Sequence, residues 1–187
     1  MPRKWGGGFF TDPTRTKNAI TAYQLQLTHY TSGVTGNLEI AREIVQEAFM
    51  RFWKTDEKKV PTTMEKPWLY RVCRNLAIDH LRRQGIVIAV GDASELEIFS
   101  TETVEPASDS ADELQTNMLS KLSQLTANQQ EILRLRYQHD MSYKEISGVT
   151  GHSVSNVGVI VHEAMRKLKK MLNADQKPSE QKATNHE

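Results

Sequence analysis

The chain has 187 residues, a formal net charge of +1 and a single cysteine, Cys73. One cysteine excludes an intrachain disulfide and favours a reducing compartment, and no apolar run approaches the roughly 18 residues of a membrane span. The near-neutral total hides an asymmetry, because residues 85–117 hold eight acidic residues and no lysine or arginine, which leaves +9 on the rest of the chain. This distribution predicts two cationic parts joined by an acidic connector.

The first 17 residues contain three consecutive glycines and two prolines and show no periodicity, which predicts a flexible leader. They lack the long apolar core of a signal peptide, so we expect a cytoplasmic protein. Residues 18–31 follow as a predicted helix that Gly33 and Gly36 end. Its apolar face consists of Ile20, Tyr23, Leu27 and Tyr30.

Residues 38–54 form the clearest amphipathic pattern of the chain. Apolar side chains recur at steps of three and four, at Leu38, Ala41, Ile44, Val45, Ala48, Phe49 and Phe52. The opposite face holds Glu39, Glu43, Gln46, Glu47 and Met50. A charged face is usually only solvated, but Met50 and Trp53 beside these acids favour a surface that docks another protein.

Residues 67–83 predict a helix with an apolar stripe and a basic face, and Pro67 suits its first turn. The stripe consists of Leu69, Val72, Cys73, Leu76 and Ala77, where the thiol acts as a small hydrophobic group. A second side holds Arg71, Arg74, Asn75, Ile78 and Arg82. Asp79 is the only acid in this segment, so the helix is either a solvated basic helix or one that lies along a phosphate backbone.

The connector 85–117 opens with the apolar run 86–90, which predicts a short strand or a patch docked on a lobe, and continues as an extended linker. Residues 118–172 then carry three helix signatures. Capping boxes at Thr126 and Ser142 precede two helices, and after Gly151 a longer helix begins at Ser153. A short helix, a glycine turn and a longer helix predict a helix-turn-helix. The polar tail 173–187 is expected to be disordered.

These segments together resemble a bacterial RNA polymerase sigma factor of the extracytoplasmic-function group. Residues 41–53 (AREIVQEAFMRFW) resemble the region 2 helix that grips the β′ clamp helices of the polymerase. Residues 68–83 (WLYRVCRNLAIDHLRR) resemble the segment that reads and melts the −10 promoter element, and residues 125–172 resemble region 4, which reads the −35 element. The resemblance implies an all-α fold of two small helical domains, region 2 at 18–84 and region 4 at 118–172, joined by a flexible acidic linker.

The resemblance also implies residue roles and partners. Core RNA polymerase would be bound through Glu43, Gln46, Glu47 and Met50, and the second lobe would meet the β flap. Promoter DNA at the −10 element would be bound by Trp68, Tyr70, Arg71, Arg74, Asn75, Asp79, Arg82 and Arg83, of which Asn75 and Asp79 match the family's own Asn and Asp. For Trp68, packing in the core is an alternative to base stacking. Factors of this group are usually restrained by an anti-sigma protein, which adds a candidate partner.

The acidic connector gains a second interpretation from the resemblance. In the family the linker threads toward the active-site cleft and the RNA exit channel, where an acidic chain could imitate RNA. An ordinary solvated spacer remains the alternative.

The predicted recognition helix departs from the family pattern, because basic residues are missing near its start. The outward candidates there are Ser155, Asn156, Gly158, Val159 and His162. The capping Ser153 is counted with the −35 residues, and Arg166, Lys167, Lys169 and Lys170 lie farther along to hold phosphate. Only Asn156 is suited to a bidentate base contact, which contributes about 1–3 kcal/mol of discrimination. We therefore expect reading of the −35 element that is either weak or biased toward the thymine methyl group, aided by another DNA-bound factor.

Two other functions compete with this interpretation. A helix-turn-helix regulator that acts without polymerase would explain residues 118–172 but not the two helices at 38–54 and 67–83. An enzyme on nucleic acid is disfavoured, because the six histidines show no metal-ligand spacing with cysteine and no phosphate loop or nucleophile elbow is present. The sequence predicts no enzyme activity and no cofactor.

Overall fold

The computed structural model describes residues 13–85 and 120–175, and all regular structure in these ranges is helical. A first lobe contains α1 (Pro13–Thr35), α2 (Leu38–Trp53), the short η1 (Thr62–Met64) and α3 (Glu65–Arg83). A second lobe contains α5 (Ala127–Leu133), the π-helical turn η3 (Arg134–Gln138), α6 (Tyr143–Thr150) and α7 (Val154–Asp175). The predicted all-α fold is confirmed.

The first lobe is built on α2, whose apolar stripe packs against α1 and α3. The predicted stripe is buried, from Ala41 at 0% to Phe49 at 7% exposed, but Leu38 at its start is 46% exposed. Asn37 caps the helix, because its side-chain oxygen accepts hydrogen bonds from the amides of Glu39 and Ile40.

Helix α1 is longer than the sequence predicts at both ends. It begins at Pro13 rather than residue 18, since proline is tolerated in a first turn. The prediction of a flexible leader over 1–17 is therefore wrong for residues 13–17. Gly33 does not break the helix either. The helix ends at Gly36, whose φ of 67° lies in the left-handed region that glycine adopts readily.

The helix-turn-helix of the second lobe forms as predicted. Both capping boxes are present, with Thr126 and Ser142 each bonded to the backbone amide three residues ahead. Gly151 ends α6 with φ of 83°, and the Ser153 hydroxyl accepts a hydrogen bond from the Asn156 amide at the start of α7. The buried side chains around this unit include Ile132, Leu135, Met141, Ile146 and Val157.

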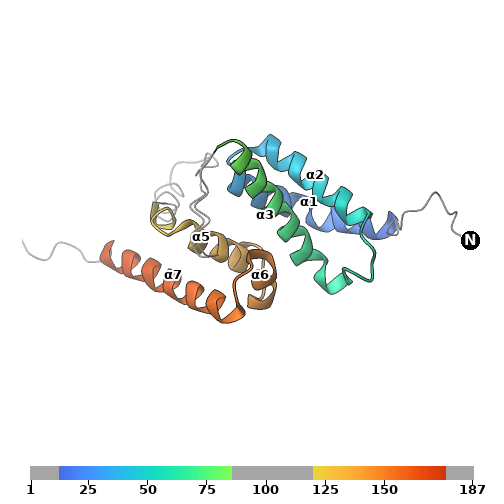
Figure 1. The fold of residues 1–187 in the computed structure, drawn as a ribbon. Coiled ribbons are helices and arrows are strands. Elements are labelled where there is room, and N and C mark those ends of the chain that lie inside the picture. The colour runs from blue at the N-terminus through green and yellow to red at the C-terminus, as the bar shows by residue number, and fades with distance from the viewer. Residues whose placement is uncertain (1–12, 86–119, 176–187) are drawn as a thin grey trace, which may run out of the picture.

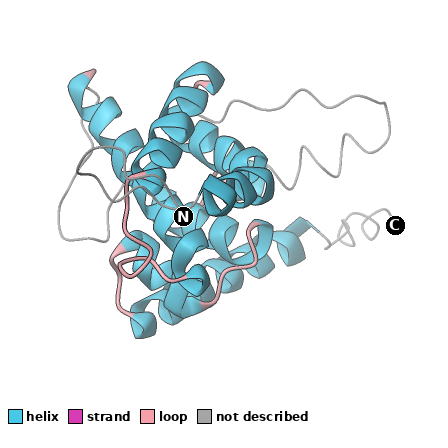
Figure 2. Cartoon of the chain, turned by 90° about the vertical axis from the view of Figure 1, so that its right-hand side faces the viewer, coloured by secondary structure: helices cyan, strands magenta, loops and turns pink. Residues whose placement is uncertain are grey.

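The two lobes are packed against each other rather than standing apart. One cluster of buried apolar side chains runs through both, and α3 contacts α6 (Figure 1). A view turned by 90° shows the helices of both lobes gathered in one body (Figure 2). The connector covers 85–117 in our prediction, and its apolar run 86–90 and its acidic residues lie outside the described residues, as do 1–12 and 176–187. Within the described ranges, no helix has the length and apolar character that crossing a membrane requires.

Candidate nucleic-acid and protein interfaces

The exposed face of α3 holds five of the predicted −10 residues. Their spacing of three to four residues places them on one side of the helix, and all are exposed: Arg71, Asn75, Asp79, Arg82 and Arg83. The nearest approach of Arg82 to Asp79 is 3.9 Å, at the limit of an ion pair, and both side chains are about half exposed. Arg71 and Arg83 form no ion pair within the described residues. This face therefore offers three arginine side chains to a polyanion.

Arg74 lies elsewhere than the sequence analysis placed it. Its guanidinium makes two hydrogen bonds to the Glu131 carboxylate, Nε to Oε1 at 2.8 Å and Nη2 to Oε2 at 3.1 Å. The two side chains are 11% and 3% exposed. Burial would lower the pKa of Arg74, but the charge of Glu131 and its hydrogen bonds outweigh burial and raise it. Ile78, one turn farther along, is also buried rather than on an outward face.

The two aromatic residues predicted to stack on bases also face inward. Tyr70 is fully buried, and its hydroxyl shares a 2.9 Å hydrogen bond with Nδ1 of His139 from the second lobe. Burial raises the pKa of Tyr70 well above its ordinary value. Trp68 is half-buried with its ring centroid 5.7 Å from that of Phe52, so the core alternative describes its position. In this arrangement Tyr70 has no ring face open to a nucleotide.

The outer face of α2 presents the residues predicted to dock polymerase. Glu43, Gln46 and Met50 are exposed, while Glu47 is half-buried and accepts a 2.8 Å hydrogen bond from Arg51. Beside them a groove of about 950 Å³ runs between α1 and α2.

The α1–α2 groove is mainly apolar, and its walls include apolar side chains that are exposed to water. Leu25 is 83% exposed, and Met50 and Trp53 are 44% and 41% exposed. Leu25 was not among the predicted site residues, although its place off the apolar face of residues 18–31 was a usable signal. Exposed apolar side chains gathered along a groove are typical of a protein-binding surface.

The predicted −35 residues are all exposed along α7: Ser153, Ser155, Asn156, Val159, His162, Arg166, Lys167, Lys169 and Lys170. Nδ2 of Asn156 lies 3.3 Å from Nδ1 of His152. The other ring nitrogen of His152, which is buried, lies 3.0 Å from Oδ1 of Asn128. Lys167 donates a hydrogen bond to the Gln124 carbonyl. The start of α7 is thus mostly small and neutral, and its positive charge begins at Arg166.

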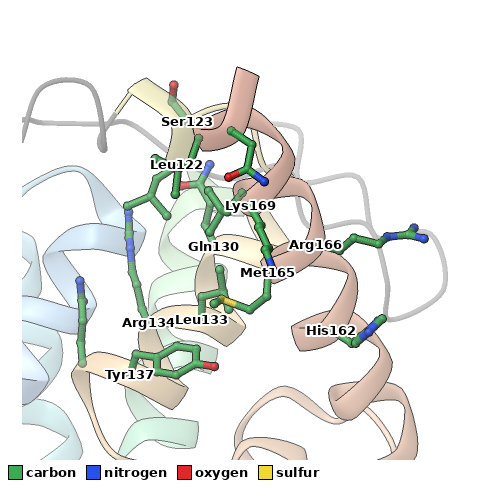
Figure 3. Close-up of a pocket in the computed structure, with 14 residues that line it drawn as sticks. Leu122, Ser123, Gln130, Leu133, Arg134, Tyr137, His162, Met165, Arg166 and Lys169 are labelled. Atoms are coloured by element: carbon green, nitrogen blue, oxygen red, sulfur yellow. The ribbon is translucent and has the colours of Figure 1, made fainter. Parts of the chain in front are cut away.

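Three of these α7 residues also line a second groove, of about 890 Å³, between α5 and α7. Its floor is apolar, with Leu133, Met165 and Leu168, and its rim includes His162, Arg166 and Lys169. In Figure 3, Arg166 and His162 extend away from the groove while Met165 reaches toward Leu133. The apolar groove is therefore bordered by polar side chains of α7 that were predicted to contact DNA.

Comparison with known proteins identifies a protein family for each of the two lobes. The model for Sigma-70 region 2 matches residues 19–86, and the model for Sigma-70 region 4 matches residues 115–168. A chain that carries these two regions in this order is an RNA polymerase sigma factor.

Relatives narrow the class. The ECF RNA polymerase sigma factor SigM of Bacillus subtilis is 28% identical over 155 residues, covering 81% of this chain and 91% of SigM. CarQ, an RNA polymerase sigma factor of Myxococcus xanthus, is 28% identical over 140 residues, covering 73% of this chain and 76% of CarQ. This chain belongs to the extracytoplasmic-function group of sigma factors, which bind core RNA polymerase and initiate transcription at promoters.

Solved structures share the fold. The sigma factor RpoE in complex with the anti-sigma factor NepR, from Bartonella quintana, matches with a TM-score of 0.64 at 21% identity, over 87% of this chain and 99% of that chain. CnrH in complex with the cytosolic domain of CnrY matches with a TM-score of 0.57 at 20% identity, over 88% of this chain and 92% of that chain.

Proposed function

We propose that the first lobe, within 18–84, docks this factor on the β′ clamp helices of core polymerase through the outer face of α2. Glu43, Gln46, Glu47 and Met50 would supply the polar and thioether contacts, and the apolar groove beside them would receive a partner side chain or helix. This proposal is supported by the position of the acidic residues, which lie on α2 next to exposed apolar side chains. A helix face that only contacts water would not be expected to expose such apolar side chains.

The same lobe, we propose, binds the −10 element through the exposed face of α3. The observation that carries this proposal is that Arg71, Arg82 and Arg83 remain exposed on one side of α3, with Asn75 and Asp79 among them. Arginine side chains suit phosphates because their planar forks bond two oxygens at once. Arg74, Trp68 and Tyr70 would join this surface only if the lobes separate or α3 rearranges.

For the second lobe, within 118–172, we propose contact with duplex DNA at the −35 element and with the β flap. Arg166, Lys167, Lys169 and Lys170 would bind phosphates, while Ser153, Ser155, Asn156, Val159 and His162 face the bases. Because only Asn156 can make a bidentate contact with a base, we expect weak sequence preference there and help from another DNA-bound factor.

An experiment separates promoter binding from polymerase binding. The double variant Arg71→Glu/Arg82→Glu reverses two exposed charges on α3, so it should keep the fold and still copurify with core polymerase. Run-off transcription from a cognate promoter should fall by more than about tenfold, since phosphate contacts are lost and charge repulsion is added. The control Lys58→Glu/Lys59→Glu makes the same charge change in an exposed loop and should transcribe normally. Full transcription by the α3 variant would refute the proposed role of this face.

The remaining assignments follow from the same proposal. The polymerase supplies the chemistry, so the chain itself is not an enzyme and needs no cofactor, and its place is the cytoplasm, at the nucleoid. The grooves on α1–α2 and α5–α7 would also suit an anti-sigma protein. A helix-turn-helix regulator without polymerase contact is disfavoured, because region 2 would then have no role.

A further inference from the structure

The boundary between the lobes contains a buried ionic cluster made by three helices. Glu131 of α5 accepts a 2.7 Å hydrogen bond from the Tyr30 hydroxyl of α1 and two hydrogen bonds from Arg74 of α3. Glu131 is 3% exposed, and its carboxylate meets one partner from each of two helices of the other lobe. We refer to Tyr30, Arg74 and Glu131 as the Glu131 cluster.

A second set of polar contacts lies beside this cluster. Besides the Tyr70–His139 hydrogen bond, Lys66 donates to the His139 carbonyl and Arg134 Nη1 lies 3.5 Å from the Gly33 carbonyl. A Cβ at Gly33 would lie 2.8 Å from that same Arg134 nitrogen, so a side chain at this position would shift the arginine. Each of these contacts joins the first lobe to the second.

This boundary has the chemistry of a contact that can open. A buried ion pair contributes little net stability, because desolvation of both charges offsets their attraction. Among the described residues, Nε2 of His139 is buried at this boundary without a hydrogen bond to a protein group. The polar contacts between the lobes resemble those of transient protein interfaces, and they lie beside the cluster of buried apolar side chains that runs through both lobes. Once the lobes separate, water or phosphate can replace both partners.

Arg74 connects this boundary to DNA. It lies within the −10 segment, three residues from Arg71. Two of its guanidinium nitrogens, Nε and Nη2, already donate hydrogen bonds to the Glu131 carboxylate. A carboxylate that holds an arginine by two bonds occupies the same donors that a phosphate would take. Resting on the function proposed above, we propose that the Glu131 cluster is a latch that holds the lobes together and withholds Arg74 and Tyr70 from promoter DNA.

The latch makes lobe opening and DNA binding linked equilibria. DNA bound to the open form should weaken the contact between lobes, and loss of the latch should strengthen DNA binding by the free protein. Coupling of this kind is typically 5- to 150-fold in affinity. The Glu131 latch is therefore a regulatory element within the chain itself.

A distance measurement tests the latch directly. Lys58→Cys and Glu163→Cys place labels on exposed positions of the two lobes, at residues to which no contact with polymerase or −10 DNA is assigned. The native Cys73 should stay unlabelled, since it is buried and burial raises its pKa to about 12. In the full-length labelled protein, Glu131→Gln should lengthen and broaden the measured distribution and raise affinity for a fluorescent oligo(dT) 20-mer at fixed salt by at least fivefold.

The chain offers a matched control. Glu65 forms a comparably buried ion pair with Arg15, at 2.6 Å and 9% and 12% exposed, but both residues belong to the first lobe. Glu65→Gln should leave both the distance and the oligo(dT) affinity unchanged. Equal shifts in the two variants would mean general loosening and would overturn the latch, as would an unchanged distance in Glu131→Gln.

Two further variants guard against misfolding and against failure of the proposed function. Tyr30→Phe/Tyr70→Phe removes only hydroxyl groups and should also lengthen the distance, while circular dichroism stays the same. The swap Arg74→Glu/Glu131→Arg re-forms the ion pair with its charges exchanged, so it should keep the short distance and should not show the fivefold gain in oligo(dT) affinity. If the wild-type protein fails to support transcription while these distances behave as stated, the proposed function is wrong and the contact between lobes stands. If transcription succeeds and the distances do not respond, the latch alone is wrong.

Discussion

Leu25 provides the sharpest test of the docking groove between α1 and α2. Its side chain is 83% exposed, so Leu25→Ala removes three carbon atoms that contribute almost nothing to the folded core. If a polymerase segment covers this side chain, the loss is about 0.8 kcal/mol for each carbon removed from water. Scaled by the exposed fraction, the binding free energy should fall by about 2 kcal/mol, or about 30-fold in Kd.

The assay is equilibrium binding of the labelled factor to purified core polymerase, followed by fluorescence anisotropy. Gln26→Ala is the matched control, since Gln26 is an exposed neighbour on α1 that does not line the groove. We expect the melting temperature of Leu25→Ala to equal that of the wild type, because an exposed side chain is removed. An unchanged Kd for Leu25→Ala, or an equal loss in Gln26→Ala, would refute the use of this groove for polymerase docking.

Three more predictions concern pH, capping and base reading. Burial, assisted by the positive charges of His29, Lys66 and Arg134, lowers the pKa of His139 to about 4 from its ordinary 6.5. The unfolded form therefore binds more protons between these values, so the folded protein should lose stability as pH falls from 6.5 toward 4. This group should have no effect above that window, and melting curves across pH will measure it. Ser142→Ala removes one side of the α6 capping box and should cost about 1 kcal/mol in chemical denaturation, seen as a lower midpoint at an unchanged slope, and a midpoint equal to that of the wild type would contradict this. Asn156→Ala should reduce discrimination at one base pair by about 1–3 kcal/mol in duplex competition assays and leave nonspecific binding unchanged. An equal loss of affinity on all sequences would mean that Asn156 contacts phosphates and not a base.

Local signals in the sequence predicted the helix-turn-helix well. The capping boxes at Thr126 and Ser142 and the left-handed Gly151 depend on residues within four positions of one another, so the sequence contains all the information they need. The stripe of α2 was predicted for the same reason, because one buried face at helical spacing identifies itself.

The basic helix α3 was predicted less well, because two different surfaces cover it. Tyr70, Arg74 and Ile78 are spaced four residues apart and form a second buried line, next to the stripe that packs within the first lobe. The partner of Arg74 lies 57 residues away in the sequence. Helical periodicity contains no information about a partner at that separation. The sequence therefore could not distinguish a buried, paired arginine at position 74 from an arginine that faces solvent.

The separation between Arg74 and Glu131 also has a consequence for how the protein is made. Ribosomes add about 5–20 residues each second, and domains near the N-terminus generally fold first. The carboxylate that neutralises Arg74 is therefore synthesised about 3–11 s after the arginine itself. During that interval the nascent first lobe presents a more basic surface than the finished protein does, and the second lobe covers it only when translation has passed Glu131.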